Sequence, residues 1–337
     1  MHPPGTSTLR AMARMRTQRH WPSREMRRAL AVAAGGWAFA AAPLTAQTAD
    51  RRLAVHGVER TYRLHVPPGL PRDGTAALVL AFHGGGGDGA RMEHLTGFSA
   101  LADRAGFAVA YPDGIARHWN DGRDSSASEA HRRRVDDLGF IAALIDTLVA
   151  ELKGDPRRVF ATGISNGAIF SHYLAAHLAG RVAAIATVAG SIAQSFAQEF
   201  APSAPVSVFM IQGTRDPLVP YAGGGVARGR HGSVIGTEAS ARLWARRDGV
   251  TAEPEVGELP DIDPADGCRV HWQRWRGGTG GTEVWLYALE GGGHTWPGGS
   301  QYLPRLVVGR VCRDLDATFA IWDFFSRHAT DGGAGGT

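Results

Sequence analysis

Lysine and cysteine are both scarce in this chain of 337 residues. Its one lysine, Lys153, stands outside any Gly-x-x-x-x-Gly-Lys pattern, which excludes a P-loop for nucleotide phosphates. A His-Glu-x-x-His motif is also missing, so nothing in the sequence points to a catalytic metal, and we expect neither a metal site nor a cofactor. The 45 glycines follow no Gly-x-y period, which excludes a collagen-like chain and places them in loops.

Hydrophobic runs long enough for a membrane span are missing near the start of the chain. The apolar run from Ala29 to Ala42 covers 14 residues, whereas a helix needs about 20 to cross a bilayer. Two arginines after Met26 precede this run and small residues follow it as far as Ala46, a pattern typical of a secretory signal peptide. We therefore expect a signal peptide and N-terminal extension over 1–46, with Met26 as the true start, and a secreted or periplasmic mature protein. A membrane anchor is the alternative, and we expect no stable one.

The net charge of +4 arises in this leader. Residues 1–46 contain seven arginines and one glutamate, whereas the remainder contains 29 basic and 31 acidic residues. A chain without surplus positive charge has no general attraction for phosphate backbones. We therefore expect no nucleic-acid partner, and the sequence indicates no particular oligomeric state.

The two cysteines are Cys268 and Cys312. Export to an oxidising compartment would permit a disulfide between them, and this bridge would close a loop that contains His294. Two buried free thiols are the alternative.

Neither an internal repeat nor a Ser/Thr/Pro-rich linker divides the rest of the chain, so we expect a single catalytic domain over 47–330 and a flexible tail over 331–337. Residues 52–66 alternate around Gly57 and predict an antiparallel hairpin at a sheet edge. Beyond it, continuous apolar runs alternate with helical stretches, which predicts the α/β class, with a mostly parallel central sheet and helices on both faces. The expected strands are 76–82, 107–111, 159–162, 182–189, 206–211, 269–275 and 283–289, and the expected helices are 98–105, 135–152, 168–178, 237–247 and 315–328.

A Gly-x-Ser-x-Gly motif, Gly163 to Gly167, lies between an expected strand and an expected helix. Its glycines permit a turn so tight that Cβ atoms would collide, and this turn exposes the hydroxyl of Ser165 at the helix N-terminus. The motif indicates a nucleophilic serine; an ordinary glycine-flanked turn is the alternative.

A serine hydroxyl is a weak nucleophile and needs a histidine base that an acid orients. In a sheet of this kind the acid and the histidine follow the serine in that order. Asp216 and His294 satisfy the order, since each stands in a loop after an expected strand and three glycines precede His294. We predict that they complete a catalytic set with Ser165. Three other aspartates compete for the acid role: Asp113, Asp136 and Asp137.

Acyl transfer also requires N–H donors for the oxyanion that develops on the substrate. One donor is typically the amide after the nucleophile, which belongs to Asn166, and the other comes from a loop after an early strand. Residues 83–89, His-Gly-Gly-Gly-Gly-Asp-Gly, provide such a loop. We expect Gly84 or Gly85 to give the second amide and His83 to orient the loop.

The same segment also fits a different class of protein. Gly84, Gly86 and Gly89 match the Gly-x-Gly-x-x-Gly fingerprint of NAD-binding oxidoreductases, and Asp113 follows the next expected strand. This alternative leaves the order of Ser165, Asp216 and His294 unexplained, and an exported protein meets little NAD.

Six ordered motifs resemble the esterase family of polyhydroxybutyrate depolymerase type, which overlaps the feruloyl esterases. They are His83–Gly87, Tyr111–Gly114, Trp119–Arg123, Val135–Phe140, Gly163–Gly167 and His294–Gly298. The resemblance covers residues 55–328 and implies an α/β-hydrolase fold, a metal-free serine carboxylic ester hydrolase, and the triad Ser165, Asp216 and His294. It implies an oligomeric or polymeric ester as the substrate. Nothing resembles a separate substrate-binding domain, which favours soluble oligomers or accessible ester side groups.

The expected substrate is a hydroxyalkanoate oligomer or polyester, with feruloyl and acetyl xylan esters as alternatives. Trp119, Tyr221 and Trp296 stand on candidate rim loops, where we expect them to bind the substrate by stacking; plain packing is the alternative. Two further alternatives are a non-catalytic secreted binding protein, which the intact catalytic set disfavours, and a peptidase of similar fold.

Overall fold

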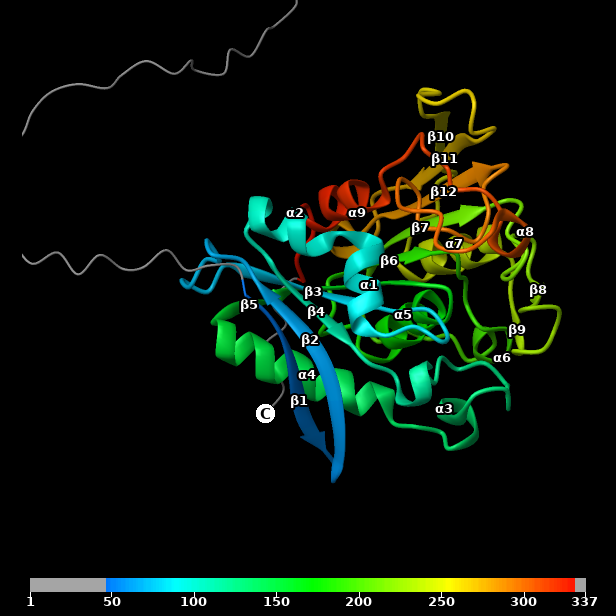
Figure 1. Ribbon diagram of the computed structural model, residues 1–337. Coiled ribbons are helices and arrows are strands. Elements are labelled where there is room, and N and C mark those ends of the chain that lie inside the picture. The colour runs from blue at the N-terminus through cyan, green and yellow to red at the C-terminus, as the bar shows by residue number, and fades with distance from the viewer. Residues whose placement is uncertain (1–46, 331–337) are drawn as a thin grey trace, which may run out of the picture. The chain divides into compact units, whose positions relative to one another are not determined.

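The structure, a computed structural model, describes residues 47–330. The signal peptide expected over 1–46 and the tail expected over 331–337 lie outside the described residues. The described chain forms a ten-stranded sheet, shown in Figure 1, with the strand order β1-β2-β4-β3-β5-β6-β7-β12-β11-β10. Its strands are β1 (Gln47–Val55), β2 (Val58–Val66), β3 (Ala76–Phe82), β4 (Ala108–Pro112), β5 (Gly154–Ile164), β6 (Ala184–Val188), β7 (Ser207–Gly213), β10 (Glu255–Glu258), β11 (Arg269–Trp275) and β12 (Val284–Glu290).

The centre of this sheet is parallel. Strands β4, β3, β5, β6, β7 and β12 pair in parallel, whereas β1 and β2 at one edge and β10 and β11 at the other join in antiparallel fashion. The sequence predicted both the mostly parallel sheet and the edge hairpin. Because the carboxyl ends of parallel strands face the same way, the loops after β3, β5, β7 and β12 meet at one edge of the sheet.

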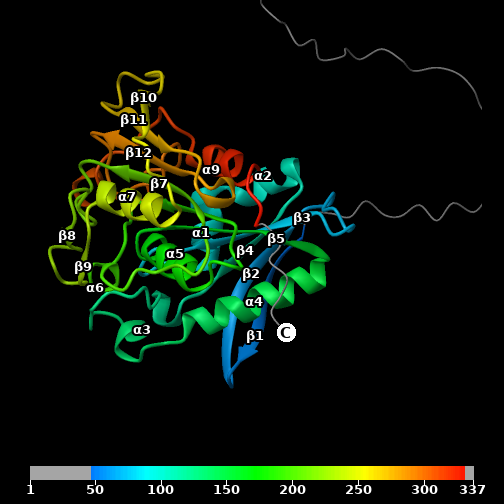
Figure 2. The same ribbon diagram turned by 180° about the vertical axis from the view of Figure 1, so that it is seen from behind.

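Helices cover both faces of the sheet, as Figures 1 and 2 show from opposite sides. Leu80 and Phe82 of β3 point into a core shared with α4, α5 and α7, whereas Val79 and Ala81 point into a core shared with α1, α2 and α9. This alternation explains why β3 reads as a continuous apolar run. The helices are α1 (Gly89–Thr96), α2 (Phe98–Ala105), α3 (Glu129–Arg132), α4 (Asp137–Leu152), α5 (Asn166–His177), α6 (Gln194–Ala197), α7 (Thr237–Arg247), α8 (Arg305–Val308) and α9 (Ala317–Phe325).

The structure differs from the expected elements in a few places. Helix α4 begins at Asp137 because the Asp136 carboxylate accepts a hydrogen bond from the amide of Gly139 at 2.8 Å and so caps the helix. Helix α1 and strand β10 were not predicted; α1 is short and largely polar, and β10 is an exposed edge strand. The segment 222–236 contains a small second sheet of β8 (Gly224–Gly225) and β9 (Ser233–Val234).

Strand β5 links two opposite edges of the sheet. Lys153 is exposed and ends α4 in a left-handed conformation with φ of 51°, directly before β5 starts. Ser165 follows the other end of the same strand. Within residues 47–330 no helix has the length and apolarity required to cross a membrane.

Candidate active site

Ser165 occupies a sharp turn between β5 and α5. Its backbone has φ of 58° and ψ of −122°, a conformation that residues with a side chain rarely adopt. A Cβ on Gly163 would lie 2.5 Å from the carbonyl of Gly167, and a Cβ on Gly167 would lie 2.3 Å from the carbonyl oxygen of Phe82. Only glycine therefore fits at these two positions, and the strained turn presents Ser165 above the edge of the sheet.

Asp216 and His294 meet at the same edge although 78 residues separate them. The Nδ1 atom of His294 lies 2.7 Å from Oδ2 of Asp216, and both side chains are buried. The other oxygen of Asp216 accepts hydrogen bonds from the amides of Leu218 and Val219, each at 2.8 Å, and Gln212 donates to Oδ2 at 3.1 Å. Since the carboxylate is an acceptor for all of these groups, it also accepts from Nδ1 of His294, which orients the ring and leaves Nε2 available as a base.

The competing aspartates have other tasks. Asp136 caps α4, and Asp137 forms a buried ion pair with Arg60 at 2.6 Å. Asp113 accepts hydrogen bonds from the amide of Gly89 at 2.8 Å and from the hydroxyl of Thr61 at 2.7 Å. Since both of its oxygens are engaged in this way, Asp113 holds the start of α1 and is not presented to a ribose, contrary to the NAD-binding alternative.

Ser165 and His294 both line a cavity of about 740 Å³. Three segments form its walls: the loop after β3, helix α1, and the segment between His294 and α8. No aspartate or glutamate of the described chain lines it. The lining residues are His83, Gly84, Gly85, Gly86, Gly87, Ala90, Arg91, Met92, His94, Leu95, Ile164, Ser165, Leu218, His294, Ser300, Tyr302 and Leu303. The cavity is therefore mostly apolar, with few polar groups besides the reactive ones.

The glycine loop after β3 lies directly against the serine. A Cβ on Gly84 would lie 3.3 Å from Cβ of Ser165, and one on Gly85 would lie 3.9 Å from Cβ of Asn166. The amides of Gly86 and Gly87 bind carbonyl groups within the described chain, whereas those of Gly84 and Gly85 have no such acceptor there. Either amide is thus available to an oxyanion, together with the amide of Asn166 at the start of α5.

His83 holds this loop in its conformation. The amide of Gly114 donates to its Nε2 at 3.0 Å, so Nε2 is an acceptor and Nδ1 carries the proton that is donated to the carbonyl of Gly84 at 2.8 Å. Burial lowers the pKa of the His83 imidazole, which favours this neutral form. His83 therefore bridges two loops and orients the glycines, as the sequence suggested.

A buried polar network holds the side chain of Asn166, and the sequence did not predict this network. The side chain of Asn166 accepts from the amide of Trp119 at 2.8 Å and donates to Asp121 at 2.6 Å. Although burial acts in the opposite direction, the guanidinium of Arg123 and the hydrogen bond from His131 hold the pKa of Asp121 below its usual range. The motif Trp119–Arg123 was visible in the sequence, but the contacts that its residues make with Asn166 could not be read from residue spacing.

The three aromatic residues expected to bind substrate lie elsewhere. Trp119 is fully buried, stacks on Phe170 and donates to the carbonyl of His83 at 3.0 Å. Trp296 is 1% exposed and donates to Thr318, and the half-buried Tyr221 contacts Glu238 through its hydroxyl. None of the three lines the cavity. This placement corrects the expectation that these three residues bind substrate in the cavity; the two indoles satisfy their N–H groups internally and pack in the core.

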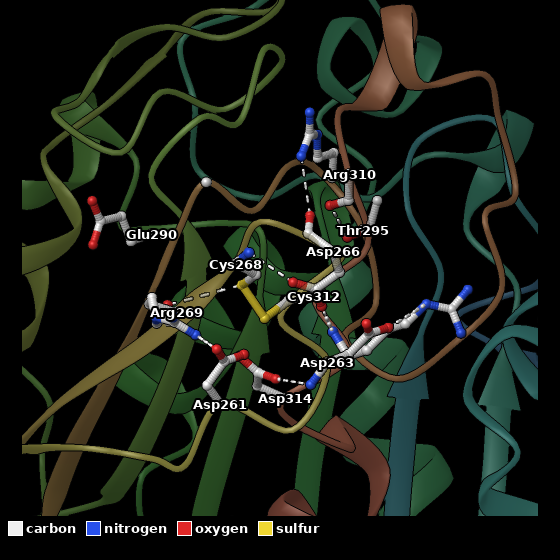
Figure 3. Close-up of a disulfide and its surroundings, with 12 residues drawn as sticks. Asp261, Asp263, Asp266, Cys268, Arg269, Glu290, Thr295, Arg310, Cys312 and Asp314 are labelled. Atoms are coloured by element: carbon white, nitrogen blue, oxygen red, sulfur yellow. Dashed lines mark hydrogen bonds and ion pairs between the residues drawn. A yellow bond between two sulfur atoms is a disulfide. The ribbon is translucent and has the colours of Figure 1, made fainter.

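A disulfide, drawn in Figure 3, links the residue before β11 to the segment that follows His294 in the chain. Cys268 and Cys312 are joined, with Cα atoms 5.5 Å apart. Asp266 reinforces the link, since its carboxylate accepts from the amide of Cys268 at 2.7 Å and from that of Arg313 at 2.6 Å. The start of β11 and the segment after His294 are thereby tied together.

Comparisons with known proteins identify relatives of this chain. Residues 60–224 match the family model described as Esterase PHB depolymerase, a range that includes Ser165 and Asp216. The chain is 33% identical over 293 residues to the putative esterase NocK of Nocardia uniformis subsp. tsuyamanensis, which covers 83% of each protein. It is 28% identical over 236 residues to feruloyl esterase B of Piromyces equi, which covers 68% of this chain and 41% of that protein.

One further relative and one solved structure are also similar to this chain. The chain is 25% identical over 254 residues to poly(3-hydroxyalkanoate) depolymerase C of Paucimonas lemoignei, covering 69% of this chain and 58% of that one. It resembles the structure of an acetyl xylan esterase from Aspergillus awamori with a TM-score of 0.54 and 16% identity, covering 73% of this chain and 94% of that one. The expected α/β-hydrolase fold is confirmed.

Proposed function

This chain is a carboxylic ester hydrolase that belongs to the PHB depolymerase family of esterases, and we propose that it works through Ser165, His294 and Asp216 by way of an acyl-enzyme. The observation that carries the proposal is the 2.7 Å contact between Nδ1 of His294 and the Asp216 carboxylate, at a cavity that both His294 and Ser165 line. A nucleophile, a base and an orienting acid at one strand edge are the requirements for acyl transfer.

In the first half of the reaction, Oγ of Ser165 attacks the ester carbonyl while Nε2 of His294 takes the hydroxyl proton. The carbonyl oxygen becomes an oxyanion, and the amide of Asn166 together with that of Gly84 or Gly85 donates to it. The C–O bond to the alcohol then breaks, and the alcohol leaves with the proton from His294. In the second half, His294 deprotonates water, which attacks the acyl-serine, and the proton returns to Oγ as the acid is released.

The substrate that we propose is a hydroxyalkanoate oligomer or the accessible ester of a polyester. The predominantly apolar cavity of about 740 Å³ supports an ester with an aliphatic body, and one relative is named a poly(3-hydroxyalkanoate) depolymerase. The second candidate is a feruloyl or acetyl xylan ester, which the names of two other relatives favour. The absence of Trp119, Trp296 and Tyr221 from the cavity wall weakens the argument for an aromatic acyl group.

We also propose that the protein is exported after removal of its leader. The Cys268–Cys312 disulfide supports this, because such bonds persist in oxidising compartments. N-terminal sequencing of the mature protein tests it: a start near Gln47 is expected, and a mature chain that retains Leu30 would refute cleavage.

The catalytic proposal is tested by the hydrolysis of 4-nitrophenyl acetate and butyrate by wild type and Ser165→Ala. We expect the variant to lose at least about 1,000-fold in kcat, in line with removal of a triad member. Ser300→Ala is the matched control, because Ser300 lines the same cavity and has no assigned chemical role. Equal rates for wild type and Ser165→Ala would refute the mechanism. Rates on hydroxybutyrate oligomers, methyl ferulate and acetylated xylan then decide the substrate class.

A further inference from the structure

The cavity has two chemically different walls. On one side, Tyr302 and Leu303 present apolar surface and are 40% and 44% exposed. Helix α1 contributes the apolar Met92 and Leu95 together with two basic side chains, Arg91 and His94. With no carboxylate of the described residues on its wall, the cavity is apolar with a positive edge along α1. Catalysis by a serine triad does not require such an edge.

The positive charge of Arg91 is not cancelled by its neighbours. Asp88 is the acid within ion-pair distance, and its Oδ1 caps α1 by accepting from the amide of Arg91 at 2.9 Å. Its Oδ2 binds Arg117 at 3.1 Å, whereas Nε of Arg91 is 3.7 Å away. Two guanidinium groups thus share one carboxylate, and the shorter contact belongs to Arg117. A surplus positive charge is left on the arginine that lines the cavity.

Arg91 also contacts the glycine loop that lies against Ser165. Its Nη1 donates to the carbonyl of Gly86 at 3.3 Å, in the loop where Gly84 lies against Ser165. The side chain is 64% exposed, so several of its N–H groups still face the cavity mouth and solvent. A guanidinium in this position can pair with a carboxylate of a molecule whose ester group reaches Ser165.

We propose that Arg91 is a specificity-determining residue that binds a free carboxylate of the substrate, so that the enzyme prefers esters with an apolar body and an anionic end. The inference rests on the proposed function. The substrate class it names is acidic esters, such as a hydroxyalkanoate oligomer with its own terminal carboxylate, in preference to neutral esters of equal length. Recognition occurs at binding, because the carboxylate keeps its charge throughout the reaction.

The test compares esters that share a carbon skeleton and differ at one terminal group, which is a carboxylate in one member of each pair and neutral in the other. One pair is 4-nitrophenyl hexanoate and mono-4-nitrophenyl adipate, which places the carboxylate on the acyl side. The other is the linear 3-hydroxybutyrate dimer and its terminal amide, which places it on the alcohol side. In wild type we expect a higher kcat/KM, through a lower KM, for the charged member of at least one pair. Arg91→Gln should reduce that preference about fivefold, as expected for a partly exposed ion pair, and salt should weaken it in wild type.

Two variants separate recognition from a structural role. Arg91→Lys keeps the charge and should retain most of the preference. Arg242→Gln removes one positive charge from an arginine that pairs with Glu238 and does not line the cavity, and should leave the preference unchanged. If wild type hydrolyses the esters without a charge preference, or if the preference survives in Arg91→Gln, the proposed role of Arg91 is refuted while the proposed function stands. If wild type hydrolyses none of the esters, the proposed function fails instead.

Discussion

The serine and the histidine of the site are held in place in two different ways. Ser165 is positioned by its own neighbours, because β5 ends one residue before it and α5 begins one residue after it. His294 lies in the segment that joins β12 to α9, and contacts with distant parts of the chain position it. Among these contacts are the hydrogen bond to Asp216 and the Cys268–Cys312 disulfide that anchors its loop.

This difference separates local from long-range determinants of activity. The turn at Ser165 depends on close backbone contacts at Gly163, within the motif, and at Gly167, against the end of the neighbouring strand β3; these contacts persist as long as the sheet exists. The histidine loop depends on partners that are far away in sequence, so its position is sensitive to changes that leave the sheet intact. We therefore expect substitutions on the serine side to act through backbone geometry, and those on the histidine side to act through orientation and stability.

The largest effect is expected at the contact between acid and base. Asp216→Asn removes the charge that selects the Nδ1-protonated form of His294, and kcat should fall by about four orders of magnitude with little change in KM. Steady-state kinetics on 4-nitrophenyl butyrate measures this. Asp136→Asn is the control, since asparagine also caps helices well and should preserve activity. A loss of less than about tenfold in Asp216→Asn would remove Asp216 from the catalytic set.

The next effect tests the local side of the comparison. In Gly167→Ala the new Cβ would lie 2.3 Å from the backbone oxygen of Phe82, so the turn must shift by about 1 Å, and a shift of this size costs about 100-fold in rate. The control is Gly180→Ala, because a Cβ on Gly180 meets no atom within 4 Å. Activity assays and melting temperatures of both variants would be compared. Wild-type kinetics in Gly167→Ala would show that the turn is less constrained than its geometry indicates.

A smaller effect tests the long-range side. Replacing Cys268 and Cys312 by alanine opens a loop that joins residues 44 apart, and the free energy of unfolding should fall by about 4 kcal/mol. Guanidinium unfolding measures the change, and wild type treated with reductant provides an independent comparison. We expect kcat to fall only severalfold, because Asp216 still binds His294. Unchanged stability in both preparations would contradict an anchoring role for the disulfide.

The smallest effect lies outside both regions and concerns pH. Burial raises the pKa of the Asp248 carboxyl to about 7, so between its unfolded and folded pKa values the native state binds a proton that the unfolded state has released. This contribution to stability is present at acidic pH and is lost as the pH rises through about 7. Between about pH 5.5 and pH 8.5, the free energy of unfolding of wild type should fall by about 2 kcal/mol more than that of Asp248→Asn. Parallel pH dependence of the two proteins would refute this shift.

The sequence predicted the fold well because the buried strands are short apolar runs with clear ends. The residues of β3, α2, α7 and β11 agree with the expected ranges, and the boundary of α4 moved only because Asp136 is its cap. The motif around Ser165 could be predicted because five consecutive residues determine its geometry. The pairing of Asp216 with His294 followed from the order of residues in a known kind of sheet, whereas their partners, such as Gln212, required coordinates.

The cavity walls were the least predictable part of the site. Trp119 and Trp296 stand in motif loops and were expected at the rim, but both indoles turn into the core. Beyond the motif residues, the wall is formed largely by α1 and by Tyr302 and Leu303, segments without a motif. Which side chains line a cavity depends on how loops from distant strands pack, and the sequence alone contains no local signal of this.

The position of Lys153 has a practical consequence. It is the sole side-chain amine of the chain and lies at the opposite end of β5 from Ser165. Amine-reactive beads or dyes would therefore attach at this residue and the α-amino terminus alone. Molecules coupled through Lys153 would be attached at the end of β5 that lies opposite Ser165, so the support would not cover the reactive serine.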